Sequence, residues 1–261
     1  MKISLLGFKN PFGETLRGIL CEPAQRKTDT AVVLAGGFER AATTEAKHRR
    51  LAERLAGLGV SSLRFDATGC GLSDGDFSRL TVSTLAGDLE AACTTMLGAG
   101  YRALSVFAHS LAGCAVSAAI DRISFEKIAL MAPALDQRGL HRFWYVQQSN
   151  PDREIGWNDW PQLIDESAFL AAAKLEMTAK SHRVAATYRE TSKDQDYAAT
   201  IGSFPAARRL LIHGAADDKV PVQSVRAKFA NQILVPKGDH DLERPGVIEQ
   251  WVGQTAEFLA T

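Results

Sequence analysis

Short apolar runs alternate with longer amphipathic stretches along most of this sequence, and this alternation constrains the fold more than any other feature. The runs AVVLAGG, SSLRFDA, ALSVFA, KIALMAP, RRLLIHG and QILVP have the length and composition of buried strands. Between the first four lie segments with apolar residues at helical spacing, such as 43–59 and 81–98. Strands that alternate with helices predict a mostly parallel sheet with helices on both faces.

The two ends of the chain extend this pattern. KISLLGFK and ETLRGILCEP flank the turn-like residues 10–13 and predict a hairpin. Near the other end, a short helix is expected around 222–229 and a final helix that ends near Leu259. Thr43 or Thr44 is the expected N-cap of the helix over 43–59. We therefore expect about eight strands in a single α/β domain that spans residues 1–261.

One segment, roughly 134–204, interrupts the alternation. It contains no run that resembles a buried strand, is rich in polar residues and holds three of the four tryptophans, Trp144, Trp157 and Trp160. We interpret it as a helical cap, or lid, inserted into the α/β domain. The tryptophans either form a small core within this cap or line a pocket for an acyl or aryl group.

Charge and cysteine content narrow the possible functions. Thirty basic residues balance thirty acidic ones, so nothing in the net charge favours nucleic acid or an anionic membrane as a partner. The four cysteines lack metal or redox spacing and are expected to be free thiols in a reducing compartment. The N-terminal stretch has no signal-peptide pattern, and no apolar run is long enough for a membrane span. We therefore expect a cytoplasmic protein.

Ser110 lies in SVFAHSLAGCAV, between a strand-like run and a helix-like run. It is either a nucleophile on a sharp turn or a polar residue that begins a helix. At the carboxyl end of a parallel strand, such a turn lifts the hydroxyl above the sheet, where sites of this fold class form. A serine hydroxyl is a weak nucleophile on its own, so this interpretation needs a base and an acid that orients the base.

Among the six histidines, His240 has the best position for that base. It lies in PKGDHDL, a polar loop directly after the strand-like run QILVP. The other five have more ordinary interpretations, as solvated residues (His48, His141, His182), as a side chain turned away from the serine (His109) or as a structural residue (His213). For the acid, Asp217 and Asp218 both lie in the loop after RRLLIHG, and position alone does not separate them.

Serine, aspartate and histidine thus follow one another at three strand ends, in the chain order of an α/β-hydrolase. The chain resembles the α/β-hydrolase superfamily from about residue 2 to its end. It is most similar to small esterases of the cinnamoyl- and feruloyl-esterase and monoacylglycerol-lipase type, grouped with serine aminopeptidase-like hydrolases. The motifs that carry this resemblance are FKNPFGETLRGIL, VVLAGGF, RFDATGCGLSDGDFSRLTV, FAHSLAGC, LLIHGAADDKVP and VPKGDHDL.

The resemblance implies roles for individual residues. It assigns the acid to Asp217, rather than Asp218, and an oxyanion hole to the backbone amides of Phe38 and Leu111. The chain departs from the family pattern in Gly36, where histidine is common. It also departs in Ala108 and Ala112, which replace the two glycines around the nucleophile. These departures leave open whether the activity is altered.

The expected function is therefore hydrolysis of a carboxylic ester with a small acyl or aryl-acyl group, through an acyl-enzyme. A thioester substrate and a non-hydrolytic ligand receptor of the same fold are the alternatives. The glycines of TGCGLSDG resemble a dinucleotide-binding loop only superficially, because no helix follows them directly. Asp239, His240, Asp241 and Glu243 could be imagined as metal ligands, but no second cluster of histidine or cysteine at ligand spacing supports a metal site. We therefore expect no metal and no organic cofactor.

Overall fold

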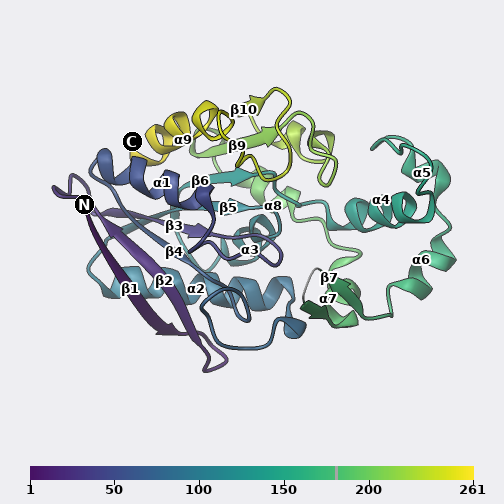
Figure 1. Cartoon of the computed structure of the whole chain (residues 1–261), viewed down its shortest axis with the longest axis horizontal. Coiled ribbons are helices and arrows are strands. Elements are labelled where there is room, and N and C mark those ends of the chain that lie inside the picture. The colour runs from purple at the N-terminus through teal and green to yellow at the C-terminus, as the bar shows by residue number, and fades with distance from the viewer. Residues whose placement is uncertain (180–181) are drawn as a thin grey trace.

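An eight-stranded sheet forms the centre of the molecule, seen in a computed structural model that describes residues 1–179 and 182–261 (Figure 1). The strands follow the order β1-β2-β4-β3-β5-β6-β9-β10 across the sheet. Their bounds are β1 Lys2–Lys9, β2 Thr15–Glu22, β3 Thr30–Ala35, β4 Ser61–Phe65, β5 Ala103–His109, β6 Phe125–Met131, β9 Arg209–Gly214 and β10 Asn231–Val235. Every apolar run singled out in the sequence is one of these strands.

The pairing of the strands separates an antiparallel edge from a parallel centre. β1 and β2 form the expected hairpin, and β2 pairs antiparallel with β4. The pairs from β4 through β3, β5, β6 and β9 to β10 are all parallel. The expected α/β-hydrolase fold, with a mostly parallel sheet of about eight strands, is therefore confirmed.

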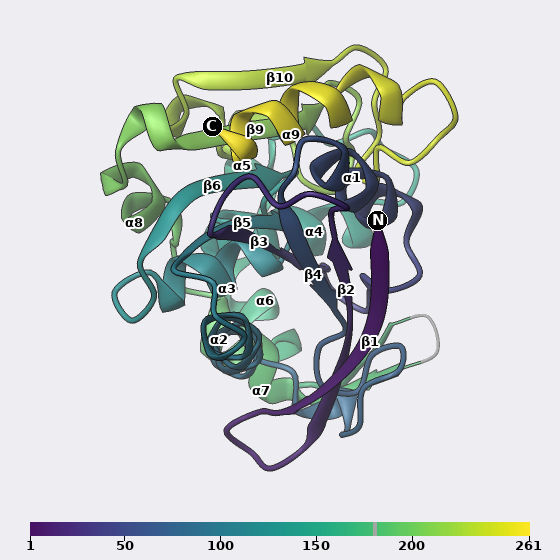
Figure 2. The ribbon, with the colours of Figure 1, turned by 90° about the vertical axis from the view of Figure 1, so that its left-hand side faces the viewer.

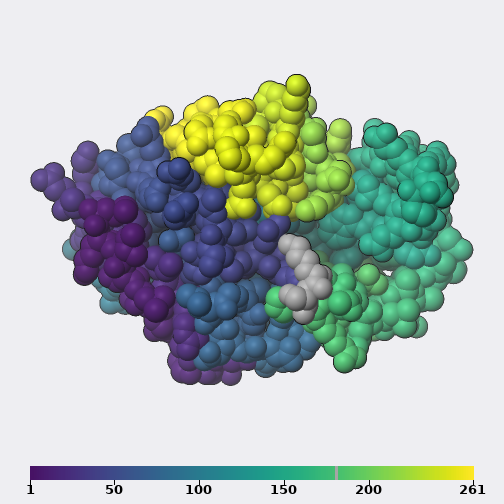
Figure 3. Space-filling model, viewed as in Figure 1, coloured from purple at the N-terminus to yellow at the C-terminus, as the bar shows by residue number. Residues whose placement is uncertain are grey.

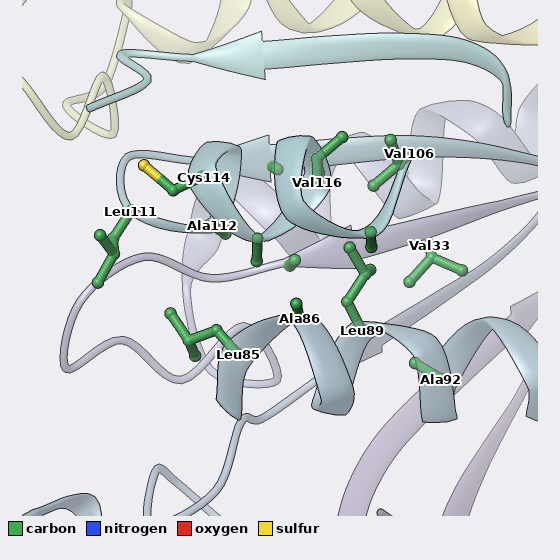
Figure 4. Packing of buried hydrophobic residues seen from close by; sticks show 14 of the residues in the cluster. Val33, Leu85, Ala86, Leu89, Ala92, Val106, Leu111, Ala112, Cys114 and Val116 are labelled. Carbon is green, nitrogen blue, oxygen red and sulfur yellow. The ribbon is translucent and has the colours of Figure 1, made fainter. Parts of the chain in front are cut away.

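Helices cover both faces of the sheet (Figures 1 and 2). Consecutive strand residues point to opposite faces. Val32 accordingly packs in a cluster with α1 (Ala46–Gly57) and α9 (Val252–Ala260), whereas Val33 packs in a cluster with α2 (Val82–Gly98) and α3 (Ala112–Ala119). Figure 4 shows the second cluster, in which Leu85 and Leu89 of α2 point toward α3 and the strands.

The N-terminal caps of two helices, α2 and α1, are formed in different ways. α2 begins after Thr81 in a capping box, where Thr81 and Thr84 hydrogen-bond each other's backbone amides. The expected cap of α1 at Thr43 or Thr44 is wrong, since Glu45 precedes the helix. The Thr43 hydroxyl instead donates to Asp66, and the Thr44 hydroxyl donates to the carbonyl of Ala41. Both hydroxyls therefore stabilise the loop before the helix.

Residues 134–204 connect β6 to β9 and form a lobe beside the sheet, teal to green in Figure 3. This insertion contains short helices and a two-stranded antiparallel sheet that the sequence did not predict. Its elements are α4 Gln137–Ser149, α5 Trp160–Leu163, α6 Glu166–Ala172, β7 Met177–Ala179, β8 His182–Val184, α7 Ala186–Ser192 and α8 Ala198–Ser203. Each of the two strands has three residues, which is too short for a recognisable alternating pattern.

Three further sequence-based expectations can be compared with the structure. The expected helix over 222–229 is instead a pair of 3₁₀ turns, Val222–Ser224 and Arg226–Lys228. The four cysteines are free, as expected, and all four are buried. Over residues 1–179 and 182–261, no helix has the length and apolar character needed to cross a membrane.

Candidate active site

Ser110 occupies a strained turn between β5 and α3. Its φ is 54°, a left-handed value that residues with a side chain rarely adopt. Its amide donates to the carbonyl of Met131 at the end of the neighbouring strand β6 (2.8 Å), and this bond holds the turn against the sheet. Such strain persists only where the surroundings enforce it and is concentrated at functional sites.

Two loops bring a histidine and an aspartate to this serine. His240 follows β10, and Asp217 follows β9. The Nδ1 of His240 lies 2.8 Å from Asp217 Oδ2, and its Nε2 lies 2.9 Å from Ser110 Oγ. Because a carboxylate only accepts hydrogen bonds, Nδ1 carries the ring proton and Nε2 is free to accept from the serine hydroxyl.

The two adjacent aspartates have different environments. Asp217 is buried, and its Oδ1 accepts hydrogen bonds from the amides of Lys219 (2.9 Å) and Val220 (3.0 Å). These bonds leave Oδ2 directed at His240. Asp218 is exposed, and no hydrogen bond links it to the histidine among the residues that the structure describes. The geometry thus connects Asp217, and not Asp218, to the chain of hydrogen bonds.

Phe38 and Leu111, the residues expected to supply an oxyanion hole, line the same cavity as Ser110. Leu111 is the residue after the serine, and Phe38 follows the glycines at the end of β3. Across the described parts of the chain, no acceptor is hydrogen-bonded to either backbone amide. Two free N–H groups beside a nucleophile could stabilise a negatively charged oxygen there.

The departures from the family pattern fit the local packing. The methyl groups of Ala108 and Ala112 are buried in the core cluster that contains α2 and α3. A side chain at Gly37 would place its Cβ 3.0 Å from Ser110 Cβ and crowd the turn that holds the serine. Gly36 is confined by the carbonyl of Arg40, 3.1 Å from a notional Cβ.

The remaining histidines differ from expectation in two cases. His48 and His141 are both buried, so the expectation that they are solvated is wrong. His48 Nδ1 lies 3.0 Å from Glu45, and His141 Nε2 lies 2.8 Å from the Ser192 hydroxyl. Burial lowers the pKa of His141 to about 3, so its ring is neutral at pH 7.

The other three histidines lie in or near the site. His109 is buried, and its Nε2 lies 3.1 Å from the carbonyl of His240, so its ring supports the His240 loop. His213 is buried and hydrogen-bonds the carbonyl of Gly214 through Nδ1 (3.0 Å). His182 is partly exposed in the insertion and contacts Glu39, the residue after Phe38.

An ion-pair cluster that sequence reasoning missed joins the loops around the site. Arg40 binds both carboxylate oxygens of Asp241, at 2.6 and 2.7 Å, and so links the Phe38 loop to the His240 loop. Lys47 is fully buried, with Glu45 at 3.0 Å and Glu243 at 3.8 Å. Arg40 and Asp241, like Lys47 and Glu243, are about 200 residues apart in sequence, so no local pattern reveals these pairs.

The charges in this cluster are strongly stabilised. Burial by itself would raise the pKa of Glu45, but hydrogen bonds from His48 and Lys47 and their charges lower it to about 2. Burial would likewise raise the pKa of Asp241, and the nearby Lys47 and Arg40 lower it. Over the described residues, no group of histidine, cysteine or acidic side chains has the arrangement of a metal site.

Above Ser110 lies a cavity of about 480 Å³ between the sheet and the insertion. The sheet side contributes Ser110, His240, Phe38 and Leu111. The insertion contributes mainly apolar and aromatic side chains, together with a few polar ones (Ala134, His141, Trp144, Tyr145, Gln148, Ser149, Phe169, Ala172, Ala173, Met177, Tyr188 and Arg189). A mostly apolar cavity with a few converging polar groups is the usual form of a small-molecule site.

The three tryptophans of the insertion divide between the two roles that the sequence left open. Trp144 lines the cavity, and its indole N–H donates to the carbonyl of Lys219 in the Asp217 loop (2.6 Å). Trp157 and Trp160 pack edge to face in a small cluster with Phe143 and Ile155, and neither lines the cavity. The pocket interpretation therefore fits only Trp144.

Comparison with known proteins identifies the family. A sequence model of the alpha/beta hydrolase family matches residues 32–251. The chain belongs to the alpha/beta hydrolase family. No curated protein sequence matches it. The family assignment confirms the superfamily resemblance seen in the motifs.

Solved structures with the same fold include esterases. Est1E from Butyrivibrio proteoclasticus with ferulic acid bound has a TM-score of 0.75 at 18% identity, covering 97% of each chain. The esterase domain of a Rhodothermus marinus protein has a TM-score of 0.68 at 18% identity, covering 100% of this chain and 98% of that one. Alpha/beta hydrolase domain-containing protein 10 from mouse has a TM-score of 0.69 at 20% identity and covers 98% of each chain. At these identities the likeness establishes the fold.

Proposed function

We propose that this protein is a serine hydrolase that cleaves a carboxylic ester through an acyl-enzyme. The observation that carries the proposal is the unbroken chain of hydrogen bonds from Asp217 through His240 to Ser110, at the edge of an apolar cavity. Membership of the alpha/beta hydrolase family and the esterases among the structural neighbours support it.

In the proposed reaction, Ser110 Oγ attacks the ester carbonyl carbon while its proton passes to His240 Nε2. The carbonyl oxygen becomes an oxyanion, which the amides of Phe38 and Leu111 stabilise. When the tetrahedral intermediate collapses, the alcohol leaves with the proton from His240. A water molecule then attacks the acyl-enzyme by the same route, and Asp217 holds the imidazole and stabilises its protonated form throughout.

We propose further that the 134–204 insertion is a cap that selects the substrate. It supplies more than half of the residues that line the cavity, and many of these residues are aromatic or small. Such a lining suits a small acyl or aryl-acyl group. The site needs no metal or organic cofactor for this chemistry.

Two alternatives remain testable. The same machinery would cleave a thioester, because attack, oxyanion and proton transfer are equivalent. A ligand receptor of this fold would bind a small molecule in the cavity without turning it over.

The deciding experiment measures turnover of short p-nitrophenyl esters and matched thioesters by the purified protein. Sustained hydrolysis that falls about 10⁶-fold in kcat in Ser110→Ala supports the hydrolase. Faster turnover of the thioesters would favour the first alternative. Ligand-induced stabilisation without turnover would favour the receptor.

A further inference from the structure

The charged side chains that line the cavity do not balance. Among the described residues of the lining, the acidic side chain is Glu39, and the arginine and lysine side chains are Arg40, Arg189 and Lys219. Glu39 is bonded to His182 in the insertion, and Arg40 is paired with Asp241. Of the remaining two cations, Arg189 lies on α7 of the insertion and Lys219 lies in the loop after β9.

Of these two cations, Arg189 is the one that is partly buried. Its guanidinium is partly buried and makes one hydrogen bond, from Nη1 to the carbonyl of Ala172 (3.2 Å). Within residues 1–179 and 182–261, no carboxylate lies within ion-pair distance of it. Burial lowers the pKa of Arg189, although a guanidinium stays charged at any physiological pH. A partly desolvated cation with most of its donors unused is costly unless something else pairs with it.

The neighbours of Arg189 do not supply that partner. His141 is neutral because of its burial, and its Nε2 proton is directed at Ser192, whose hydroxyl donates to the carbonyl of Tyr188. The nearby Phe169 ring is occupied by Arg142, whose guanidinium lies 4.6 Å from the ring centre. Arg189 lines the mostly apolar cavity, where its remaining donors are available to a bound group and charge interactions are stronger than in water.

We propose that Arg189 is the centre of a carboxylate-binding subsite, so that the substrate is an ester whose acyl or alcohol part carries a carboxylate. This inference rests on the proposed hydrolase function and names its substrate class. The planar guanidinium fork matches one carboxylate in a bidentate pair. Lys219 is exposed at the rim, where its charge attracts an anion but is screened by salt.

Two matched substrate pairs test this and separate the acyl part from the alcohol part. Mono-p-nitrophenyl adipate and p-nitrophenyl hexanoate differ in an acyl carboxylate, whereas 4-acetoxybenzoate and its methyl ester differ in a carboxylate on the leaving group. We expect a higher kcat/KM for the charged member of one pair. Arg189→Gln is expected to lower that preference about 10- to 100-fold, the effect of losing a charge-assisted pair.

Control variants distinguish the subsite from a structural role. Arg189→Lys keeps the charge and should retain part of the preference, and Lys219→Gln should reduce it only two- to threefold, as is usual for an exposed charge. Arg153→Gln removes an exposed arginine of the insertion outside the cavity and should change nothing. Hydrolysis of the neutral esters should be unchanged in Arg153→Gln, and circular dichroism checks that all four variants are folded.

A binding measurement keeps this inference separate from the proposed function. Calorimetry compares monomethyl adipate with dimethyl adipate on Ser110→Ala, which needs no turnover. Preference for the monoester that is lost when Arg189→Gln is added supports the subsite, even if the wild type hydrolyses no ester. Equal binding of the two esters, or a preference that survives Arg189→Gln, overturns the subsite. If the wild-type enzyme still hydrolyses esters, the hydrolase proposal stands.

Discussion

The sheet with its covering helices and the 134–204 insertion are built differently. The sheet region buries two large apolar clusters around strands of five to eight residues and helices of up to 17 residues. In the insertion, the helices have four to 13 residues and the two strands three each. The two clusters around Leu140 and Phe143 contain only three buried residues each, and one of these, Val220, comes from the Asp217 loop.

This difference matches a division of tasks. Ser110, Asp217 and His240 all lie in turns or loops that follow strands of the central sheet, which suits chemistry that requires accurate placement. Most of the residues that line the cavity belong to the insertion. We therefore attribute the reaction to the sheet region and the choice of substrate to the insertion.

The insertion itself is not uniform. Val184, Tyr188 and Ile201, from β8, α7 and α8, belong to the large core cluster. The tryptophan-rich part around α4 and α5 packs mainly on itself, apart from contacts such as that of Trp144 with Lys219. Substitutions in the part around α4 and α5 are therefore expected to lower the stability of the whole protein least.

The largest expected effect concerns the two adjacent acids of the sheet region. Asp217→Asn should lower kcat about 10⁴-fold, because the histidine loses the group that sets its tautomer and stabilises its charge. Asp218→Asn should lower kcat less than about tenfold, a difference of roughly 4 kcal/mol in barrier. The test is kcat of each variant on one activated ester, with folding checked by circular dichroism. A more damaging Asp218→Asn would mean that the wrong acid is assigned.

Part of the fold and of the candidate site can be predicted from local sequence patterns. Strand identity and the order of serine, aspartate and histidine follow from local patterns, because buried parallel strands are apolar runs and sites form at their carboxyl ends. The burial of His48 was missed, since its ring packs against Phe107 and lies near the carbonyl of Ala35, and only the folded chain brings these residues together. The two short strands of the insertion carry too few residues for any periodicity.

Substitutions of buried aromatic residues should lower the unfolding free energy more in the sheet region than in the insertion. Phe107 is fully buried and stacks on Trp251, with ring centres 5.8 Å apart, so Phe107→Ala should cost about 3–5 kcal/mol of unfolding free energy. Trp160 is partly buried in the small cluster of the insertion, and Trp160→Ala should cost only about 1 kcal/mol. Urea unfolding measures both. Similar costs would show that the insertion is as integral to the fold as the sheet.

The link between the Phe38 and His240 loops should have a smaller effect on catalysis. Arg40→Gln should lower kcat/KM for a neutral ester about tenfold, because the paired loops lose their fixed spacing. Asp241→Asn should act similarly. The double variant should be little worse than either single one, as expected for two residues that act through one contact. Fully additive effects would show that the ion pair does not position the site.

The smallest effect concerns the cavity wall. Trp144→Ala should change the relative rates on short and long acyl esters several-fold, because it enlarges the space available to the acyl group. Trp157→Ala is the matched control, since Trp157 packs behind the wall without lining the cavity. The measurement is kcat/KM across a series of p-nitrophenyl esters. An equal shift in both variants would assign the tryptophans a structural role only.

The central claim is that the sheet region positions Ser110 as an activated nucleophile, and covalent labelling tests it most directly. The protein is treated with a fluorophosphonate, and the modified peptide is located by mass spectrometry. We predict one adduct on Ser110, which is lost in Ser110→Ala and formed much more slowly in Asp217→Asn than in Asp218→Asn. An adduct on another residue, or no adduct on a folded protein, would contradict the claim.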